Sequence, residues 1–496
     1  MKIAVIGTGY VGLVAGACFA ELGQDVLLVD NDEEKMAALQ RGECPIHEKF
    51  LPELLERHRG ARLGFTTNLA DAVARSQLVF IAVGTPPKED GDADLSYVES
   101  VARGIAGAID DYKVVVEKST VPVYTNHWIR KVMLLNGAPA ELFDVASNPE
   151  FLREGSAVAD FLYPDRIVVG SDSERASETL ALAYQPLLDG SYYKRANAIP
   201  GQTPSPHTAR LIPTSARSAE LIKHASNAFL ALKISFINTV SAVCEAVGAD
   251  VEQVCEGIGS DSRIGRGFLS PGIGYGGSCF PKDLLAFRAV AQENGCSFGL
   301  LDEVVSVNKE QRRRFLRKVK RALWTLKGKK LAVLGLAFKN GTDDIRESPA
   351  IAIVKSLLKE GCSIAAYDPA AMVRAQEDAE LAGSVKFAGD PYDALHGADA
   401  CLVLTEWEDF AALDLARVKT LLRYPIVVDG RNLFKPAQME AAGINYYSVG
   451  RPDMVGERRA AVRERITAEI KIQASLTGAS GEPTPLADAI NEDQAA

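Results

Sequence analysis

Short, continuous hydrophobic runs alternate with segments of helical periodicity in the N-terminal part of the chain. The run at 2–6 (KIAVI) is followed by a glycine-rich turn, an Ala- and Leu-rich helical pattern that ends at Gly23, and a second run at 26–30 (VLLVD). Further runs at 78–83 and 113–117 are hydrophobic throughout rather than alternating, as in strands that are buried on both faces of a parallel sheet. The pattern predicts a doubly wound α/β domain.

The same order of runs returns in the C-terminal part. Residues 330–335 (KLAVLG) repeat 2–7 (KIAVIG), and the run at 364–368 (IAAYD) again ends in Asp. Runs at 400–404 and 426–429 correspond to the third and fourth runs of the N-terminal part. Four runs recurring in one order predict a second nucleotide-type α/β domain.

A long segment rich in Ala, Leu and Ile, 215–247, lies between the two repeats and has helical periodicity without Gly or Pro. At 1.5 Å per residue such a helix reaches about 50 Å, enough to join two domains and offer a face to a partner subunit. The Pro- and Gly-containing segment 200–213 before it is predicted to be a loop.

Composition and charge exclude several classes of function. The 65 acidic and 55 basic residues give a net charge of −10, which disfavours nucleic acid or an anionic membrane as a partner. The eight Cys form no CxxC pair, and the six His lack metal-ligand spacing, so neither a metal site nor a disulfide framework is expected. Glycines interrupt the first apolar run, and no later run reaches the roughly 18 residues of a membrane span. We therefore predict a soluble, cytoplasmic protein.

The turn after the first run carries the spacing of a dinucleotide fingerprint. Gly7, Gly9 and Gly12 lie between a predicted strand and a predicted helix, where glycines allow a tight turn, close approach to a pyrophosphate and close packing of helix on strand. Asp30 ends the second run, where an acid binds ribose hydroxyls and repels a 2′-phosphate. The alternative is a glycine-rich turn that binds no ligand, but the flanking strand and helix favour a dinucleotide site. Because Asp30 repels a 2′-phosphate, the expected dinucleotide is NAD rather than NADP.

The string GIGYGGSCFPKD at 272–283 is the most unusual in the chain. Its glycines permit a backbone that wraps a ligand, and Pro281 fits the first turn of a helix predicted over 283–293. Cys279 then lies at or just before a helix N-terminus, where the macrodipole is expected to lower the thiol pKa and favour a nucleophilic thiolate. The alternative of an inert, buried thiol fits the cysteines in apolar segments, namely Cys18, Cys244, Cys255, Cys362 and Cys401.

Polar residues on the long helix are a second candidate feature. Lys223 and Asn227 are four residues apart and share a face. They form either a solvated stripe or a pair that stabilises an oxyanion, if a substrate lies between this helix and Cys279. The strings KSTVP (118–122) and NPEFLRE (148–154) follow strand-like runs on the side of the sheet where ligands bind.

Taken in order, these strings make the chain resemble the UDP-glucose 6-dehydrogenases of the nucleotide-sugar 6-dehydrogenase superfamily. The likeness runs from Met1 to about Gly450 and includes VGTPP, DSRIG, AFKNGTDDIRESP and VVDGRN besides the strings above. It implies two successive NAD-dependent oxidations of UDP-glucose to UDP-glucuronate, with a cysteine thioester between them. It also implies an α/β fold of two Rossmann-like doubly wound domains joined by a long-helix central dimerisation region.

The resemblance sets the expected domain boundaries. The expected regions are an NAD-binding domain at 1–205, a helical dimerisation region at 206–325 with the Cys loop, a UDP-sugar-binding domain at 326–450, and a C-terminal extension at 451–496 with a disordered end. The expected partners are UDP-glucose and a second copy of the chain, in a homodimer or a larger homo-oligomer.

Catalytic roles follow from the same resemblance. It implies that Cys279 is the nucleophile, that Lys223 and Asn227 stabilise the oxyanion, and that Asp283 with Thr120 positions water. The sixth expected catalytic residue is Glu150, which assists proton transfer during hydrolysis.

Ligand-binding roles are implied in the same way. Arg263 resembles an arginine donated by a neighbouring subunit, and Arg346 one that reaches the cofactor. The expected NAD-binding residues are Gly7, Gly9, Tyr10, Val11, Gly12, Asp30, Lys35, Thr85, Thr120, Glu154 and Arg346. The expected substrate-binding residues are Glu150, Phe151, Leu152, Lys223, Asn227, Arg263, Tyr275, Gly276, Phe338, Lys339 and Arg431.

The sequence departs from the family pattern at two places, and three alternative functions are considered. The 200–213 loop is longer than usual, and His47-Glu48-Lys49 replaces an aromatic-Glu-Pro pattern. The alternatives are a 6-dehydrogenase for GDP-mannose or an N-acetylated UDP-sugar, a single-step hydroxyacid dehydrogenase, and a catalytically silent NAD-binding scaffold. GGSCFPKD favours the UDP-glucose branch, since acetamido-sugar relatives typically have His before the Cys.

Overall fold

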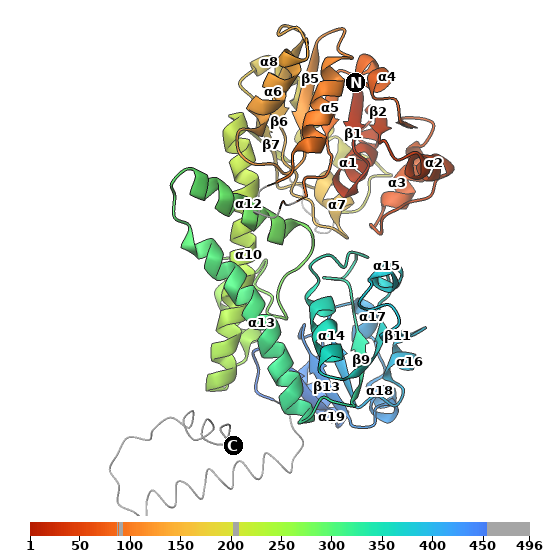
Figure 1. Cartoon of the computed structure of the whole chain (residues 1–496), viewed down its shortest axis with the longest axis vertical. Coiled ribbons are helices and arrows are strands. Elements are labelled where there is room, and N and C mark those ends of the chain that lie inside the picture. The colour runs from red at the N-terminus through yellow and green to blue at the C-terminus, as the bar shows by residue number, and fades with distance from the viewer. Residues whose placement is uncertain (87, 89–92, 202–207, 454–496) are drawn as a thin grey trace, which may run out of the picture.

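The computed structural model describes residues 1–453 except 87, 89–92 and 202–207. The N-terminal part forms a sheet in the order β3-β2-β1-β4-β5-β6-β7-β8, parallel throughout except between β6 and β7 (Figure 1). Its strands are β1 Lys2–Ile6, β2 Asp25–Val29, β3 Leu63–Thr66, β4 Leu78–Ile81, β5 Lys113–Glu117, β6 Phe143–Ser147, β7 Arg166–Gly170 and β8 Arg210–Thr214.

Helices cover both faces of this sheet, as the continuous hydrophobic runs predict. Ile3 and Val5 of β1 pack in one hydrophobic core, whereas Ala4 and Ile6 pack in another. The first core includes α1 Tyr10–Glu21, α2 Glu33–Arg41, α3 Leu51–His58, α7 Ala157–Leu162, α8 Glu174–Ala183, α9 Gln185–Leu188 and the short 3-10 helix Tyr192–Lys194. The second includes α4 Leu69–Arg75, α5 Ser96–Ala106 and α6 Thr125–Leu135.

The C-terminal part forms a second parallel sheet in the order β11-β10-β9-β12-β13-β14, which repeats the order of the first six strands. Gly7 and Gly335, at the turns after β1 and β9, share a φ of +99°. The strands are β9 Lys330–Leu334, β10 Ser363–Tyr367, β11 Val385–Phe387, β12 Ala400–Val403, β13 Ile426–Asp429 and β14 Asn445–Ser448. The helices are α14 Pro349–Lys359, α15 Met372–Glu377, α16 Pro391–Leu395, α17 Glu408–Ala411, α18 Leu415–Leu421 and α19 Pro436–Ala441. The repeat in the sequence thus corresponds to a second doubly wound sheet.

A helical region connects the two sheets (Figure 1). It consists of α10 Ala216–Val247, α11 Val251–Gly259, α12 Cys279–Glu293 and α13 Gly299–Leu323. The side chain of Ser215 caps α10 by accepting from Ser218 N, and Gly248 ends it in the left-handed region. Contrary to the expectation from the sequence, α10 is long and apolar enough to span a membrane, with a mean hydropathy of 1.5 over 18 residues. It packs instead against β6, β7, α12 and α13, and it carries buried polar side chains, as a core helix does.

One expectation about the segment before α10 is wrong. Residues 210–213, expected in a loop because the segment 200–213 contains Pro and Gly, instead belong to β8, which pairs with β7, so the first sheet extends past residue 205. β8 is the edge strand, where Pro213 can be accommodated despite its missing N–H. Residues 202–207 of that segment lie outside the described residues. Most of the C-terminal extension, 454–496, also lies outside them, and with it the expected disordered end.

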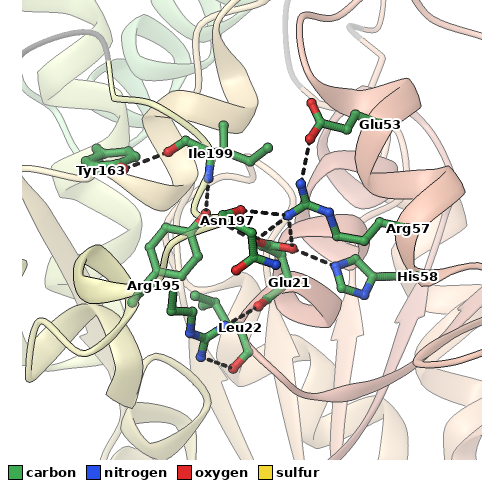
Figure 2. Close-up of polar contacts among 10 residues, drawn as sticks. Glu21, Leu22, Glu53, Arg57, His58, Tyr163, Arg195, Asn197 and Ile199 are labelled. Carbon is green, nitrogen blue, oxygen red and sulfur yellow. Dashed lines mark hydrogen bonds and ion pairs between the residues drawn. The ribbon is translucent and has the colours of Figure 1, made fainter.

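The chain before this segment is fixed to the end of α1 by a buried charge cluster (Figure 2). The carboxylate of Glu21 accepts from Arg57 at 2.9 Å and lies 2.6 Å from His58 Nε2. Arg195 donates to the Glu21 carbonyl oxygen at 2.7 Å, and Tyr192 Oη accepts from the backbone N–H of Ile199 at 2.9 Å. These bonds fix residues 195–199, directly before the segment 200–213.

Candidate active site

The turn after β1 leaves room for a ligand at the start of α1. A Cβ on Gly7 would lie 2.6 Å from the Ala82 carbonyl oxygen, and one on Gly12 would overlap the Gly7 carbonyl. At Gly9, the N-cap of α1, no described atom beyond the immediate chain lies within 4 Å of such a Cβ. Gly7 and Gly12 therefore serve close packing, while Gly9 leaves the helix N-terminus open to a pyrophosphate.

Asp30 directly follows β2, beside this turn. Its Oδ2 accepts from Thr8 N at 2.8 Å and from Thr8 Oγ1 at 2.6 Å, and it lies 2.9 Å from Lys35 Nζ. Burial alone would raise the pKa of Asp30, but the bonds from Thr8 and Lys35 outweigh burial and lower it. The carboxylate is therefore ionised at neutral pH, as is needed to accept from ribose hydroxyls.

Cys279 is the first residue of α12, as its sequence context predicts. Its Sγ lies 3.7 Å from Ser278 Oγ, which also donates to Glu154 at 3.2 Å. The expected lowering of its pKa is wrong for the free protein, because burial and the Glu150 carboxylate raise the pKa of the thiol to about 11. The charge of Lys223 opposes this rise without cancelling it. The resting thiol is therefore protonated at neutral pH.

Lys223 and Asn227 of α10 both face the protein interior. Lys223 Nζ lies 2.7 Å from Glu150 Oε1, and both side chains are only 4% exposed. Asn227 Nδ2 donates to Asp283 Oδ2 at 2.6 Å, and Lys282 Nζ to Asp283 Oδ1 at 2.7 Å. The solvated-stripe alternative is therefore wrong.

The charges of this buried group are set by its neighbours. Burial lowers the pKa of Lys223, but the carboxylates of Glu150 and Asp283 outweigh it, and the pKa is raised. Burial raises the pKa of Asp283, whereas Lys282 and Lys223 reverse the effect and lower it. An ammonium group and a carboxylate thus stand near the thiol, and groups of these kinds can stabilise an oxyanion and orient water.

The NPEF segment forms one wall of this region. Glu150 Oε2 accepts from Leu152 N at 2.6 Å. The Arg166 guanidinium lies over the ring of Phe151, 3.9 Å from the ring centroid. Lys223 Nζ lies 5.7 Å from the same centroid. These contacts fix the segment against both the first sheet and α10.

The glycine loop before Cys279 packs on the C-terminal domain. Tyr275 exchanges two backbone hydrogen bonds with the Asn308 side chain, at 2.9 and 3.0 Å. A Cβ on Gly276 would overlap the Glu347 carbonyl, and one on Gly277 would lie 2.8 Å from the Phe338 ring. The glycines therefore permit close approach between two segments that carry expected substrate-binding residues.

Arg431 and Lys339 are two basic residues of the C-terminal domain that were expected to bind substrate. Arg431 donates to the carbonyl oxygens of Phe338 at 2.8 Å and Leu404 at 2.9 Å. Burial lowers the pKa of Lys339, against the opposing charge of Glu154. Lys339 is thus a buried amine of the C-terminal domain whose charged form is favoured by Glu154 of the N-terminal domain.

A cluster of charges bridges the two domains. Arg346 lies 2.7 Å from Asp344 and 3.5 Å from Glu154 of the N-terminal domain. Burial, followed by the charge of Asp344, raises the pKa of Glu154 to about 8. Arg346 thus joins a carboxylate of each domain.

Other residues singled out in the sequence lie outside this buried group or had no expected role. Arg263 lies between α11 and α12, is 87% exposed, and pairs with Asp261 at 2.6 Å, away from the buried group. Thr85 Oγ1 donates to the Thr120 carbonyl at 2.8 Å, which places these two expected residues together. Sequence reasoning assigned no role to Lys118, although KSTVP contains it. The residue is buried, donates to Asn148 Oδ1 at 3.0 Å, and has its pKa lowered to about 8 by burial.

Comparison with known proteins follows the same three-part division. The chain matches the NAD binding domain of the UDP-glucose/GDP-mannose dehydrogenase family over residues 1–188, its central domain over 217–310 and its UDP binding domain over 332–436. It is 45% identical over 456 residues to a UDP-glucose 6-dehydrogenase of Bacillus subtilis, covering 92% of this chain and 94% of that protein. It is 46% identical over 458 residues to a UDP-glucose 6-dehydrogenase of Rhizobium meliloti, covering 91% of this chain and all of that protein.

Solved structures show the same similarity. A UDP-glucose dehydrogenase from the archaeon Pyrobaculum islandicum superposes with a TM-score of 0.80 at 38% identity, covering 91% of this chain and 98% of that one. A UDP-D-ManNAc dehydrogenase from Pyrococcus horikoshii superposes with a TM-score of 0.76 at 27% identity, covering 92% of this chain and 100% of that one.

Proposed function

Because the chain belongs to the UDP-glucose/GDP-mannose dehydrogenase family, we propose that it oxidises UDP-glucose to UDP-glucuronate in two NAD-dependent steps at one site. The observation that carries the proposal is the buried arrangement of the Cys279 thiol with the Lys223–Glu150 and Asn227–Asp283 pairs. The higher identity to UDP-glucose dehydrogenases than to a UDP-D-ManNAc dehydrogenase supports UDP-glucose as the sugar nucleotide.

The residues that would hold NAD fit that group. Gly9 leaves the α1 N-terminus open for the pyrophosphate, and ionised Asp30 accepts from ribose hydroxyls. Bound NAD supplies the acceptor for one hydride in each oxidation. The further proposed NAD-binding residues are Gly7, Tyr10, Val11, Gly12, Lys35, Thr85, Thr120, Glu154 and Arg346.

The substrate is proposed to lie between α10, the glycine loop and the C-terminal domain. There the Lys223 ammonium and the Asn227 amide stabilise negative charge on the oxygen at C6. The further proposed substrate-binding residues are Glu150, Phe151, Leu152, Tyr275, Gly276, Phe338, Lys339 and Arg431, with Arg263 supplied by a second subunit.

A nucleophile makes the second oxidation feasible. An aldehyde has no hydride-donating tetrahedral carbon, so the Cys279 sulfur adds to C6 while the thiol proton leaves and the carbonyl oxygen takes up a proton. Loss of a hydride from C6 and a proton from the hydroxyl converts this thiohemiacetal into a thioester. Water held by Asp283 and Thr120 then adds to the thioester, the C–S bond breaks, and the thiol and carboxylate form, with Glu150 assisting proton transfer.

The substrate assignment can be tested with a panel of nucleotide sugars and both cofactors, monitored for NADH or NADPH. We expect the highest kcat/KM with UDP-glucose and NAD, because Asp30 repels a 2′-phosphate. Faster turnover of GDP-mannose or an N-acetylated UDP-sugar would overturn the substrate assignment. Use of NADP equal to that of NAD would overturn the role of Asp30, and no reduced cofactor with any sugar would indicate a silent scaffold.

The exposed apolar face of α10 supports a homodimer as the smallest assembly. Phe229, Phe236 and Val243 follow one another at seven-residue intervals and are 61%, 53% and 57% exposed. A stripe of this spacing on a long helix suits packing against a second helix. The exposure of Arg263 supports its donation to the partner's site.

Charge on that stripe should separate the subunits. We expect Phe236→Asp to give a monomer in light scattering and to lower kcat, because burying a carboxylate between two apolar helix faces costs several kcal/mol and the monomer lacks the partner's Arg263. Val373→Asp, at an exposed apolar residue of α15, is the matched control and should leave assembly and activity unchanged. A fully active Phe236→Asp monomer would contradict both the interface and the role of Arg263.

A further inference from the structure

Four polar residues of α10 form two pairs with different partners. Lys223 and Asn227 bind Glu150 and Asp283 of the proposed catalytic group. Glu220 and His224, also four residues apart, are equally buried but face the segment between β5 and α6. The mechanism above uses the first pair and leaves the second unexplained.

Glu220 holds the start of α6. Its two carboxylate oxygens accept from the backbone N–H groups of Tyr124 and Asn126, each at 2.8 Å. Tyr124 has a φ of +80°, which a bulky residue rarely adopts, so the turn must be imposed by its surroundings. Burial raises the pKa of both Glu117 and Glu220, and the charge of Glu220 raises the pKa of Glu117 further.

His224 holds the same segment from the other end. Its Nε2 lies 2.7 Å from the Val121 carbonyl oxygen, and a carbonyl only accepts, so Nε2 carries the proton. On the other side, the imidazole lies 6.0 Å from the ring of Phe287, one turn beyond Asp283 on α12. His224 therefore contacts both elements that carry the residues proposed to position water.

Thr120 lies between two anchors. Its own carbonyl accepts from Thr85 Oγ1 at 2.8 Å, and the next carbonyl, that of Val121, faces His224. Consecutive carbonyl groups are thus fixed by different parts of the molecule, the segment after β4 on one side and α10 on the other. The His224 bond fixes the position of Thr120 relative to the helix that carries Lys223 and Asn227.

We propose that Glu220 and His224 are positioning residues for thioester hydrolysis, which hold Thr120 in register with Asp283. The proposal rests on the proposed function, because it assigns these residues to its last step. Addition of the thiol depends on Cys279, Lys223 and Asn227, and the side-chain hydrogen bonds of Lys223 and Asn227 go to Glu150 and Asp283, outside this segment. Loosening the segment should therefore slow hydrolysis more than the steps that form the thioester.

Met and Gln variants at position 224 separate the hydrogen bond from the packing. Both side chains have similar length, but only Gln can donate to the Val121 carbonyl. With UDP-glucose and excess NAD, we expect His224→Met to retain the initial release of two NADH per active site. Its steady-state rate should fall about ten- to a hundred-fold, and acylated Cys279 should accumulate in mass spectra of the quenched protein. His224→Gln should recover most of the rate.

Two further variants keep the test decisive. His127→Met, at an exposed histidine of α6, is the matched control and should behave as wild type. If His224→Met melts below the assay temperature, Glu220→Gln takes its place, since it keeps one acceptor and loses the other. It should show the same accumulation to a smaller extent.

The outcomes distinguish this proposal from the proposed function. If the wild type releases two NADH per sugar but the Met and Gln variants hydrolyse the thioester equally fast, the positioning role is wrong. It is also wrong if the Met variant slows the initial NADH release as much as the steady state. If the wild type itself releases no NADH from UDP-glucose, the proposed function fails and not the positioning role alone.

Discussion

Cys279→Ser is expected to abolish UDP-glucuronate formation while leaving NAD affinity unchanged. A serine hydroxyl is far less acidic than a thiol, and no other described nucleophile is assigned to the aldehyde carbon, so the second oxidation loses its tetrahedral intermediate. The loss in kcat should be on the order of 10⁴-fold or more. NAD binding should persist because the glycine turn and Asp30 lie in the N-terminal domain, apart from α12.

Product chromatography and a direct NAD-binding measurement test this expectation. Cys296→Ser is the matched control, because that thiol is exposed and has no proposed role. Near-normal turnover of Cys279→Ser would show that the covalent mechanism is wrong and would favour a single-step dehydrogenase.

Lys223→Met is expected to damage both catalysis and stability. Removal of a charged oxyanion stabiliser from a buried site should lower kcat by about 10² to 10³. The same change leaves the Glu150 carboxylate buried without its cation, which costs about 3 to 5 kcal/mol of unfolding free energy.

A second substitution separates the two effects. Adding Glu150→Gln to Lys223→Met removes the unpaired charge, so denaturant unfolding should show most of the stability restored while kcat stays low. Lys320→Met, which breaks only an exposed pair with Glu360, is the control and should alter neither quantity. Recovery of activity in the double variant would mean that Lys223 acts only through stability.

Much of the fold follows from local pattern. Each continuous run corresponds to a strand whose alternate residues enter different cores, as Ile3 and Ala4 do. The start of α12 at Cys279 follows from glycines and a proline within a few residues of it. β8 escaped prediction because Pro213 is tolerated only through the position of the strand at the sheet edge, which local sequence does not encode.

The electrostatics of the site could not be predicted from local pattern. A helix N-terminus predicts a low thiol pKa for Cys279, yet burial and distant carboxylates reverse the direction. Glu150 reaches Lys223 across 73 positions of sequence, and Glu154 meets Arg346 across a domain boundary. Such pairs depend on how separate elements pack, and motif spacing carries no information about that.

The number of NADH released per UDP-glucose consumed tests the two-step mechanism most directly. With limiting UDP-glucose and excess NAD, the wild-type protein is expected to release two NADH for each sugar, because the aldehyde is oxidised again on Cys279 before it can leave. A ratio of one NADH per sugar, with an aldehyde as the product, would contradict the proposed mechanism.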